Sequence, residues 1–181
     1  MRGKSHRDLG KYLAQRYMQH LPKTYVRAFL IGCVEPDRNY ATYLKGSLRA
    51  QWLRGHNFEN SSRFMQRLAA RLESKSRLGL FDCYAAGKLI HYTVDAFTYV
   101  HNSVFQEPLA QHREYEAALQ NYFLNFLSEG SPMRLGSSGT IMDTIRSYHQ
   151  RYISRPADIR RDSRYAFAVT NLVAGRLFCG A

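Results

Sequence analysis

Histidine and acidic residues recur along this chain at spacings that suit metal coordination. The series consists of His6, Asp37, His56, His91, Asp95, His101, His112 and Glu116. Zinc readily accepts imidazole nitrogens and carboxylate oxygens as donors, and a catalytic zinc keeps one position open for water. Two metal ions held side by side can stabilise both the attacking and the leaving oxygen of a displacement at phosphorus. The series therefore predicts a site for more than one metal ion, and phosphodiester hydrolysis is the chemistry that it favours.

Two pairs in the series have the tightest spacing. His91 and Asp95 are four residues apart, as are His112 and Glu116, so each pair lies on one face of a helix and can reach one ion. His101 lies about 80° from His91 around an ideal helix and suits a neighbouring ion better. Either pair alone could be a simple hydrogen bond. His91 and Asp95 are the strongest candidates because they lie in an apolar segment, where unpaired polar groups are costly to bury.

The other members of the series are isolated in the sequence. Asp37 follows Pro36, and the proline predicts a loop at this position. His56 is expected just before a helix. Asp37 and His56 gain their value from their order in the series, whereas His20 and His149 match no part of it and are predicted to be surface residues.

Helical patterns dominate the segments that must position these residues. No alternating apolar and polar run is long enough to predict a sheet. Helices are expected over residues 7–20, Thr24–Val34, Phe58–Leu72, Phe81–Val100, Gln111–Leu127, Ile141–Ile153 and Ala157–Phe178. Phe81–Val100 is apolar almost all round and is predicted to be a central buried helix, and Ser128–Thr140 the main loop. The predicted fold is an all-α, single-domain multi-helix bundle over residues 1–181.

Length and composition limit the class of protein further. With 181 residues, of which 45% are hydrophobic, the chain can form one sizeable core. We find neither a signal peptide nor an apolar run long enough to span a bilayer. The three cysteines are odd in number and widely spaced, so they are predicted to be reduced core residues. These features favour a cytoplasmic protein.

The net charge of +12 indicates an affinity for anionic partners. Basic residues cluster at Arg2–Arg16, Lys75–Arg77 and Arg151–Arg164. Such a surface attracts phosphate-rich polymers or the anionic leaflet of a membrane, so a peripheral membrane contact is expected. A merely solvated surface is an equally good interpretation. The charge is compatible with phosphate chemistry but does not discriminate between lipid and nucleic acid.

In its order and spacing, the series resembles the zinc-dependent phospholipase C family, whose fold the S1/P1 nucleases share. The resemblance covers residues 1 to about 128 and is most specific for the last five ligands. It implies a helical domain with two to three zinc ions at the base of a cleft. One zinc would be held by Asp37, His56, His91 and Asp95, and another by His101, His112 and Glu116. A third would use His6 and the amino terminus, with Asp95 shared between it and the first.

The resemblance also implies a mechanism. A hydroxide bridging the zinc ions would attack phosphorus, and Asp37 would orient or deprotonate it. Characterised members begin, after processing, with a Trp that binds the third zinc, whereas this chain begins with Met1. Arg38 stands where the choline-binding lipases carry an aromatic residue, and arginine suits an anionic phosphate better than a quaternary ammonium. The reaction is therefore predicted better than the headgroup of a phospholipid substrate.

Two alternatives to a phospholipase C remain open. A single-strand nuclease of the same fold is favoured by the pI of about 9.9, but Glu116 ends the last ligand pair where the similar nucleases carry Asp. A non-catalytic, zinc-stabilised domain would bind anionic membranes or a protein partner. His101, His112 and Glu116 leave one zinc position open, and this favours catalysis over a closed structural site.

Overall fold

The computed structural model describes residues 1–39, 57–102, 109–129, 136, 139–156 and 158–179. These residues form seven α-helices and no strand, which confirms the predicted all-α fold. The helices are α1 (Gly3–Tyr17), α2 (Lys23–Arg38), α3 (Phe58–Glu73), α4 (Leu80–Ala96), α5 (Leu109–Glu129), α6 (Ile141–Ile153) and α7 (Ile159–Cys179). A short 3-10 turn, η2 (Tyr99–His101), follows α4.

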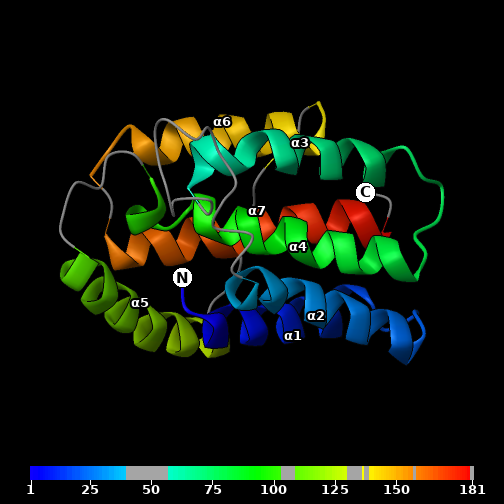
Figure 1. Ribbon diagram of the computed structural model, residues 1–181, viewed down its shortest axis with the longest axis horizontal. Coiled ribbons are helices and arrows are strands. Elements are labelled where there is room, and N and C mark those ends of the chain that lie inside the picture. The colour runs from blue at the N-terminus through cyan, green and yellow to red at the C-terminus, as the bar shows by residue number, and fades with distance from the viewer. Residues whose placement is uncertain (40–56, 103–108, 130–135, 137–138, 157, 180–181) are drawn as a thin grey trace.

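The helices are stacked in three layers (Figure 1). Helices α4 and α7 form the middle layer, with α3 and α6 on one side and α1 and α2 on the other. Helix α5 packs against α1, α7 and η2. Helix α4 contacts α1, α2, α3 and α7, and every residue from Leu89 to Thr98 is buried. Because apolar burial drives folding, a helix that is apolar all round belongs at this central position, as predicted.

Two glycines allow α2 and α4 to approach each other closely. A Cβ atom at Gly32 would lie 2.2 Å from the carbonyl oxygen of Tyr84, and one at Gly87 would lie 2.1 Å from that of Phe29. Neither distance is possible between real atoms, so both positions require glycine. The close approach brings the C-terminal turn of α2 against the half of α4 that carries His91.

Helix α2 continues past the proline that was expected to end it. Pro36 lies inside the helix and is buried, and Asp37 lies in the last turn, so the predicted loop at Asp37 is wrong. A proline in a helix interior costs about 3 kcal/mol, and we attribute its tolerance here to the packing of α2 against α4. The backbone N–H of Asn39 donates to the carbonyl of Glu35 at 3.0 Å and completes the final turn.

Helix α4 ends at Ala96, four residues before the predicted end at Val100. The side chain of Thr98 donates a hydrogen bond to the carbonyl of Val94 at 3.0 Å, and the chain then turns into η2. This side-chain bond is one way in which threonine competes with helical structure. His101 therefore lies outside the helix of His91, and their angle around an ideal helix does not apply.

Two further predictions are corrected by burial. His20 is exposed as predicted, but His149 is only 4% exposed, because it lies on the inner face of α6 and its ring stacks on Phe58. Cys33 and Cys83 are free and buried, whereas Cys179 is free but exposed and so is not a core residue.

Within the described residues, we find no helix that is both long and apolar enough to cross a membrane.

Candidate metal centre

Two groups of histidine and carboxylate side chains meet on the inner faces of the helices. The first metal group comprises His6, His91 and Asp95, and the second metal group comprises His101, His112 and Glu116. Within each group the donor atoms lie within 4.8 Å of one another. The chain thus brings α1, α4, η2 and α5 together at one place.

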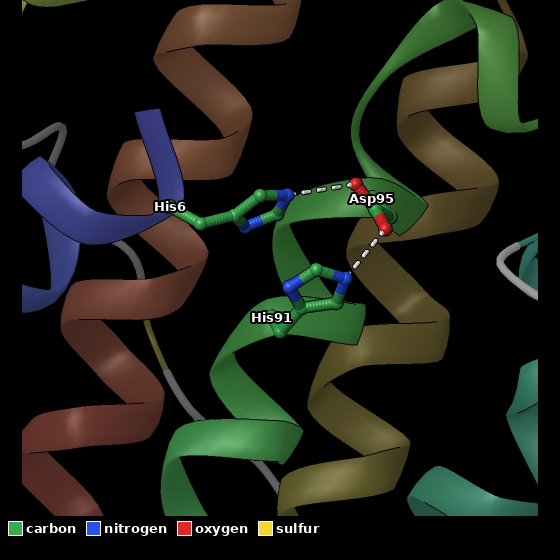
Figure 2. A group of neighbouring side chains, drawn as sticks. All are labelled: His6, His91 and Asp95. Atoms are coloured by element: carbon green, nitrogen blue, oxygen red, sulfur yellow. Dashed lines mark ion pairs between the residues drawn. The ribbon is translucent and has the colours of Figure 1, made fainter. Parts of the chain in front are cut away.

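The first metal group is centred on the carboxylate of Asp95. His6 Nε2 lies 3.3 Å from Asp95 Oδ1, and His91 Nε2 lies 3.2 Å from Asp95 Oδ2. Figure 2 shows the imidazoles of α1 and α4 pointing toward this one carboxylate. The two rings stack with their centroids 3.9 Å apart. All three side chains are buried, so their polar atoms must be satisfied inside the protein.

The second metal group is centred on the carboxylate of Glu116. His101 Nε2 lies 3.3 Å, and His112 Nε2 3.7 Å, from Glu116 Oε1. His101 Nε2 also lies 3.6 Å from Asp95 Oδ1, so the two groups are neighbours. Helix α5 supplies His112 and Glu116 from adjacent turns of one face, as their four-residue spacing predicts.

The separations of these atoms fit zinc. A zinc ion bound tetrahedrally at 2.0–2.1 Å from its donors needs donor atoms about 3.3 Å from one another. The imidazole and carboxylate atoms within the two groups are 3.2–3.7 Å apart. The donor types and their spacing therefore suit a divalent ion in each group.

The imidazole of His91 is held in the orientation of a metal ligand. Its Nδ1 lies 3.0 Å from the carbonyl oxygen of Cys33, which can only accept a hydrogen bond. When Nδ1 carries this proton, Nε2 of a neutral ring has a lone pair that faces the carboxylate of Asp95. Two acceptors that face each other require a cation between them, either a second proton or a metal ion. Metal-binding histidines are commonly fixed by a backbone carbonyl in this way.

His6 is the least constrained member of the first metal group, and Asp37 lies beside the group. His6 Nε2 also lies 3.0 Å from the carbonyl oxygen of Met1, and its Nδ1 has no hydrogen-bond partner among the described residues. The structure thus fixes His6 less firmly than His91. Asp37 Oδ1 lies 3.7 Å from His91 Nε2, on the exposed side of the group. His56, the remaining candidate ligand, lies outside the described residues.

The amino group of Met1 lies between the two groups. Its nitrogen is 2.9 Å from Asp95 Oδ1, 3.1 Å from Glu116 Oε1 and 2.8 Å from His101 Nε2. A positive charge at this place is stabilised by both carboxylates, which again indicates a site that attracts cations. Burial disfavours the ammonium, but Asp95 and Glu116 outweigh it and raise the pKa of the Met1 amine to about 11.

Protonation of the other groups follows from the same charges. Burial opposes ionisation of Asp95, yet His101 and the Met1 ammonium hold the pKa of this carboxyl well below its usual value. Burial, followed by the charge of His91, lowers the pKa of His6 to about 4. Burial and the Met1 ammonium also lower the pKa of His101. Ionised carboxylates and neutral imidazoles are the forms that bind metal.

Two groups at this site could not be predicted from the spacing of the histidine and acidic residues. The Cys33 carbonyl that orients His91 is a backbone group, and the nearby Gly32 is a local sign of a close helix contact. The family resemblance predicts that the Met1 amine lies at the site, whereas the spacing of the residues alone does not predict it.

An all-helical protein with two adjacent histidine and carboxylate groups has the features of a metal-dependent hydrolase. The sequence matches the model of the family described as Zinc dependent phospholipase C over residues 5–159. The chain belongs to this family, which consists of phosphodiester hydrolases. The match includes every candidate ligand side chain and extends about thirty residues beyond residue 128, where the resemblance of the ligand series ends. No curated protein and no solved structure matches the chain.

Proposed function

We propose that this protein hydrolyses the phosphodiester bond of a phospholipid with two to three zinc ions bound at the two metal groups. The observation that carries the proposal is the contact between the groups, where His101 Nε2 and Asp95 Oδ1 are 3.6 Å apart. Two ions held by neighbouring groups can act on one phosphate together. A structural site needs only one ion with a closed set of ligands.

In this proposal His91 and Asp95 of the first metal group, with Asp37 and His56, hold one zinc, and the second metal group holds another. A third would use His6, Asp95 and the amino group of Met1. When bound, zinc would supply a water of low pKa and a positive charge to stabilise the phosphoryl oxygens. Asp37 would orient this water or accept its proton, because its carboxylate is partly exposed beside His91.

The substrate class rests on family membership and on charge. The family name denotes a phospholipase, and the net charge of +12 suits a substrate in an anionic surface. Arg38, which is exposed next to Asp37, favours contact with phosphate over contact with a choline group. A single domain, peripheral membrane contact and a cleft over the zinc ions remain predictions.

The first experiment measures zinc per chain by elemental analysis, alongside release of phosphorylated headgroup from phospholipid vesicles. The native protein is expected to hold two to three zinc ions and to release headgroup. An Asp95→Asn, His112→Ala double variant is expected to hold almost no zinc. Asp95→Asn removes the carboxylate of the first metal group, and His112→Ala removes an imidazole of the second. A protein that neither contains nor takes up zinc would contradict the proposal.

Substrate controls separate the alternatives. Zinc-dependent cleavage of single-stranded DNA without lipid hydrolysis would support the nuclease. Bound zinc without either activity, together with unfolding on chelation, would support a zinc-stabilised binding domain. Only zinc-dependent lipid hydrolysis supports the phospholipase.

A further inference from the structure

A buried carboxylate outside both metal groups accepts hydrogen bonds from three separate elements. Asp162, in the first turn of α7, is 0% exposed. Its Oδ2 accepts from the backbone N–H of Tyr99 at 2.9 Å and from the hydroxyl of Tyr115 at 2.8 Å. Its Oδ1 accepts from the hydroxyl of Tyr152 at 2.5 Å. A buried carboxylate is stable only with such donors, so these contacts are strong constraints on the groups that make them.

Two of the three donors belong to the elements that carry the second metal group. Tyr99 lies in η2, the same 3-10 turn as His101. Tyr115 lies in α5, directly before Glu116 and three residues after His112. One oxygen of Asp162 therefore joins the two segments whose side chains must meet to form this group. The third donor, Tyr152, comes from α6, which carries no candidate ligand.

We propose that Asp162 is a positioning residue that holds η2 against α5 and so sets the geometry of the second metal group. This inference rests on the proposed function, because it assumes that His101, His112 and Glu116 bind zinc. Asp162 lies three residues beyond the end of the family match at residue 159. The match to the family therefore does not account for it.

The tyrosine hydroxyls that donate to Asp162 suit a permanent structural contact. Burial and the negative charge of Asp162 raise the pKa of both Tyr115 and Tyr152, so their hydroxyls remain protonated and donate throughout the neutral range. The ring of Tyr99 lies 5.7 Å from that of Tyr115, which adds a packing contact between η2 and α5. Ligand positions held by outer hydrogen bonds are typically sensitive to their loss.

The two tyrosines provide a matched pair of variants for the test. Tyr115→Phe and Tyr152→Phe each remove one hydroxyl that donates to the same carboxylate, but only Tyr115 links it to α5. Zinc affinity is measured by competition with a chromogenic chelator, using zinc alone as the ligand. A His112→Ala variant identifies which of the bound ions belongs to the second metal group.

Tyr115→Phe is expected to weaken zinc binding at the second metal group by about ten- to a hundredfold, as is usual for loss of an outer hydrogen bond. Tyr152→Phe is expected to remain within about twofold of the native affinity, although both variants melt at lower temperature. Asp162→Ala is expected to weaken zinc binding at the second metal group. Asp162→Asn is expected to weaken it much less, because an amide oxygen can still accept hydrogen bonds from Tyr99 and Tyr115.

Three results would overturn the inference. Equal weakening by both tyrosine variants would show that Asp162 only stabilises the fold. Native affinity in Tyr115→Phe, in a protein where His112→Ala removes one zinc, would disprove the positioning role and leave the proposed function intact. If the native protein bound no zinc that depends on His112, the proposed function itself would fail and the inference with it.

Discussion

At the residue scale, the imidazole of His91 illustrates how one backbone contact selects a chemical role. The Nδ1–H group of His91 donates a hydrogen bond to the carbonyl of Cys33, and Nε2 is left facing Asp95. Without a cation at Nε2, two acceptors would oppose each other in a buried place, which is costly. The same reasoning does not apply to His6, whose Nδ1 has no acceptor among the described residues.

We therefore expect His91→Ala to have a larger effect than removal of a histidine outside the metal groups. The variant should lose one zinc per chain, and headgroup release should fall by at least about a hundredfold, as for loss of a group that stabilises transition-state charge. Elemental analysis and initial rates measure the two effects. His20→Ala, at an exposed histidine, is the control and should match the native protein. Full activity in His91→Ala would disprove its role.

A second prediction concerns His149, which is buried but belongs to neither metal group. Burial lowers the pKa of His149 to about 4, although Glu59 opposes this effect. In the unfolded chain the pKa is about 6.5, so the unfolded state binds more protons between these values. The free energy of unfolding should therefore fall as the pH is lowered from about 7 to about 4. Protonation of His149 should account for about 3 kcal/mol of this decrease.

Denaturant unfolding at several pH values tests this contribution. His149→Gln keeps a donor for Asn102, whose Oδ1 lies 2.7 Å from His149 Nε2, but it cannot take up a proton. Its stability should depend less steeply on pH than that of the native protein, whereas His20→Gln should not change the slope. Parallel curves for the native protein and His149→Gln would contradict the prediction.

At the scale of the elements, the contact between α2 and α4 sets the position of Asp37 relative to His91. A methyl group at Gly32 would meet the backbone of Tyr84, and one at Gly87 would meet the backbone of Phe29. Backbone atoms cannot rotate away as a flexible side chain can. The helices must therefore separate if either glycine is enlarged, and this moves Asp37 and the Cys33 carbonyl away from His91.

Gly32→Ala and Gly87→Ala are thus expected to destabilise the protein by about 1–3 kcal/mol or more, as overpacking does, and to weaken zinc binding at the first metal group. Gly175→Ala is the matched control, because its Cβ would be 3.6 Å from the nearest atom, a ring carbon of Tyr17. This substitution should be neutral or stabilising, since alanine favours a helix over glycine by about 1 kcal/mol.

Thermal melts measure the change in stability, and zinc titration measures the change in zinc binding. A native-like Gly32→Ala variant would contradict the close-packing argument.

The elements that could be predicted are those whose signals are local. The apolar pattern of α3 and α6 predicted their bounds nearly to the residue, and the spacing of His112 and Glu116 placed both on one helix. The wrong predictions depend on contacts distant in sequence. Helix α2 continues past Pro36 because it packs against α4, and His149 is buried because its ring stacks on Phe58. No local pattern brings Asp162 to Tyr99 and Tyr115, because α7 is remote from both in sequence.

At the scale of the whole molecule, the charge distribution has two opposite parts. Each metal group contains one carboxylate, of which Asp95 is buried and Glu116 largely so. The chain as a whole carries a net charge of +12, and basic residues such as Arg155, Arg160 and Arg164 are exposed. Anionic surfaces are therefore attracted to the molecule, while cations are attracted to its centre.

We expect this charge to make vesicle binding depend on both lipid composition and salt. Each basic residue near an anionic membrane contributes about 1 kcal/mol, and screening shortens the range of this attraction from about 10 Å at 0.1 M salt to about 3 Å at 1 M. In a sedimentation assay, the protein should bind anionic vesicles at low salt, bind zwitterionic vesicles weakly, and leave both at high salt. Zinc content should stay constant throughout, because the ligands of the first metal group are buried. An Arg160→Glu, Arg164→Glu variant should release anionic vesicles at lower salt with unchanged zinc content. Equal binding to both vesicle types, insensitive to salt, would mean that apolar contact and not charge brings the protein to a membrane.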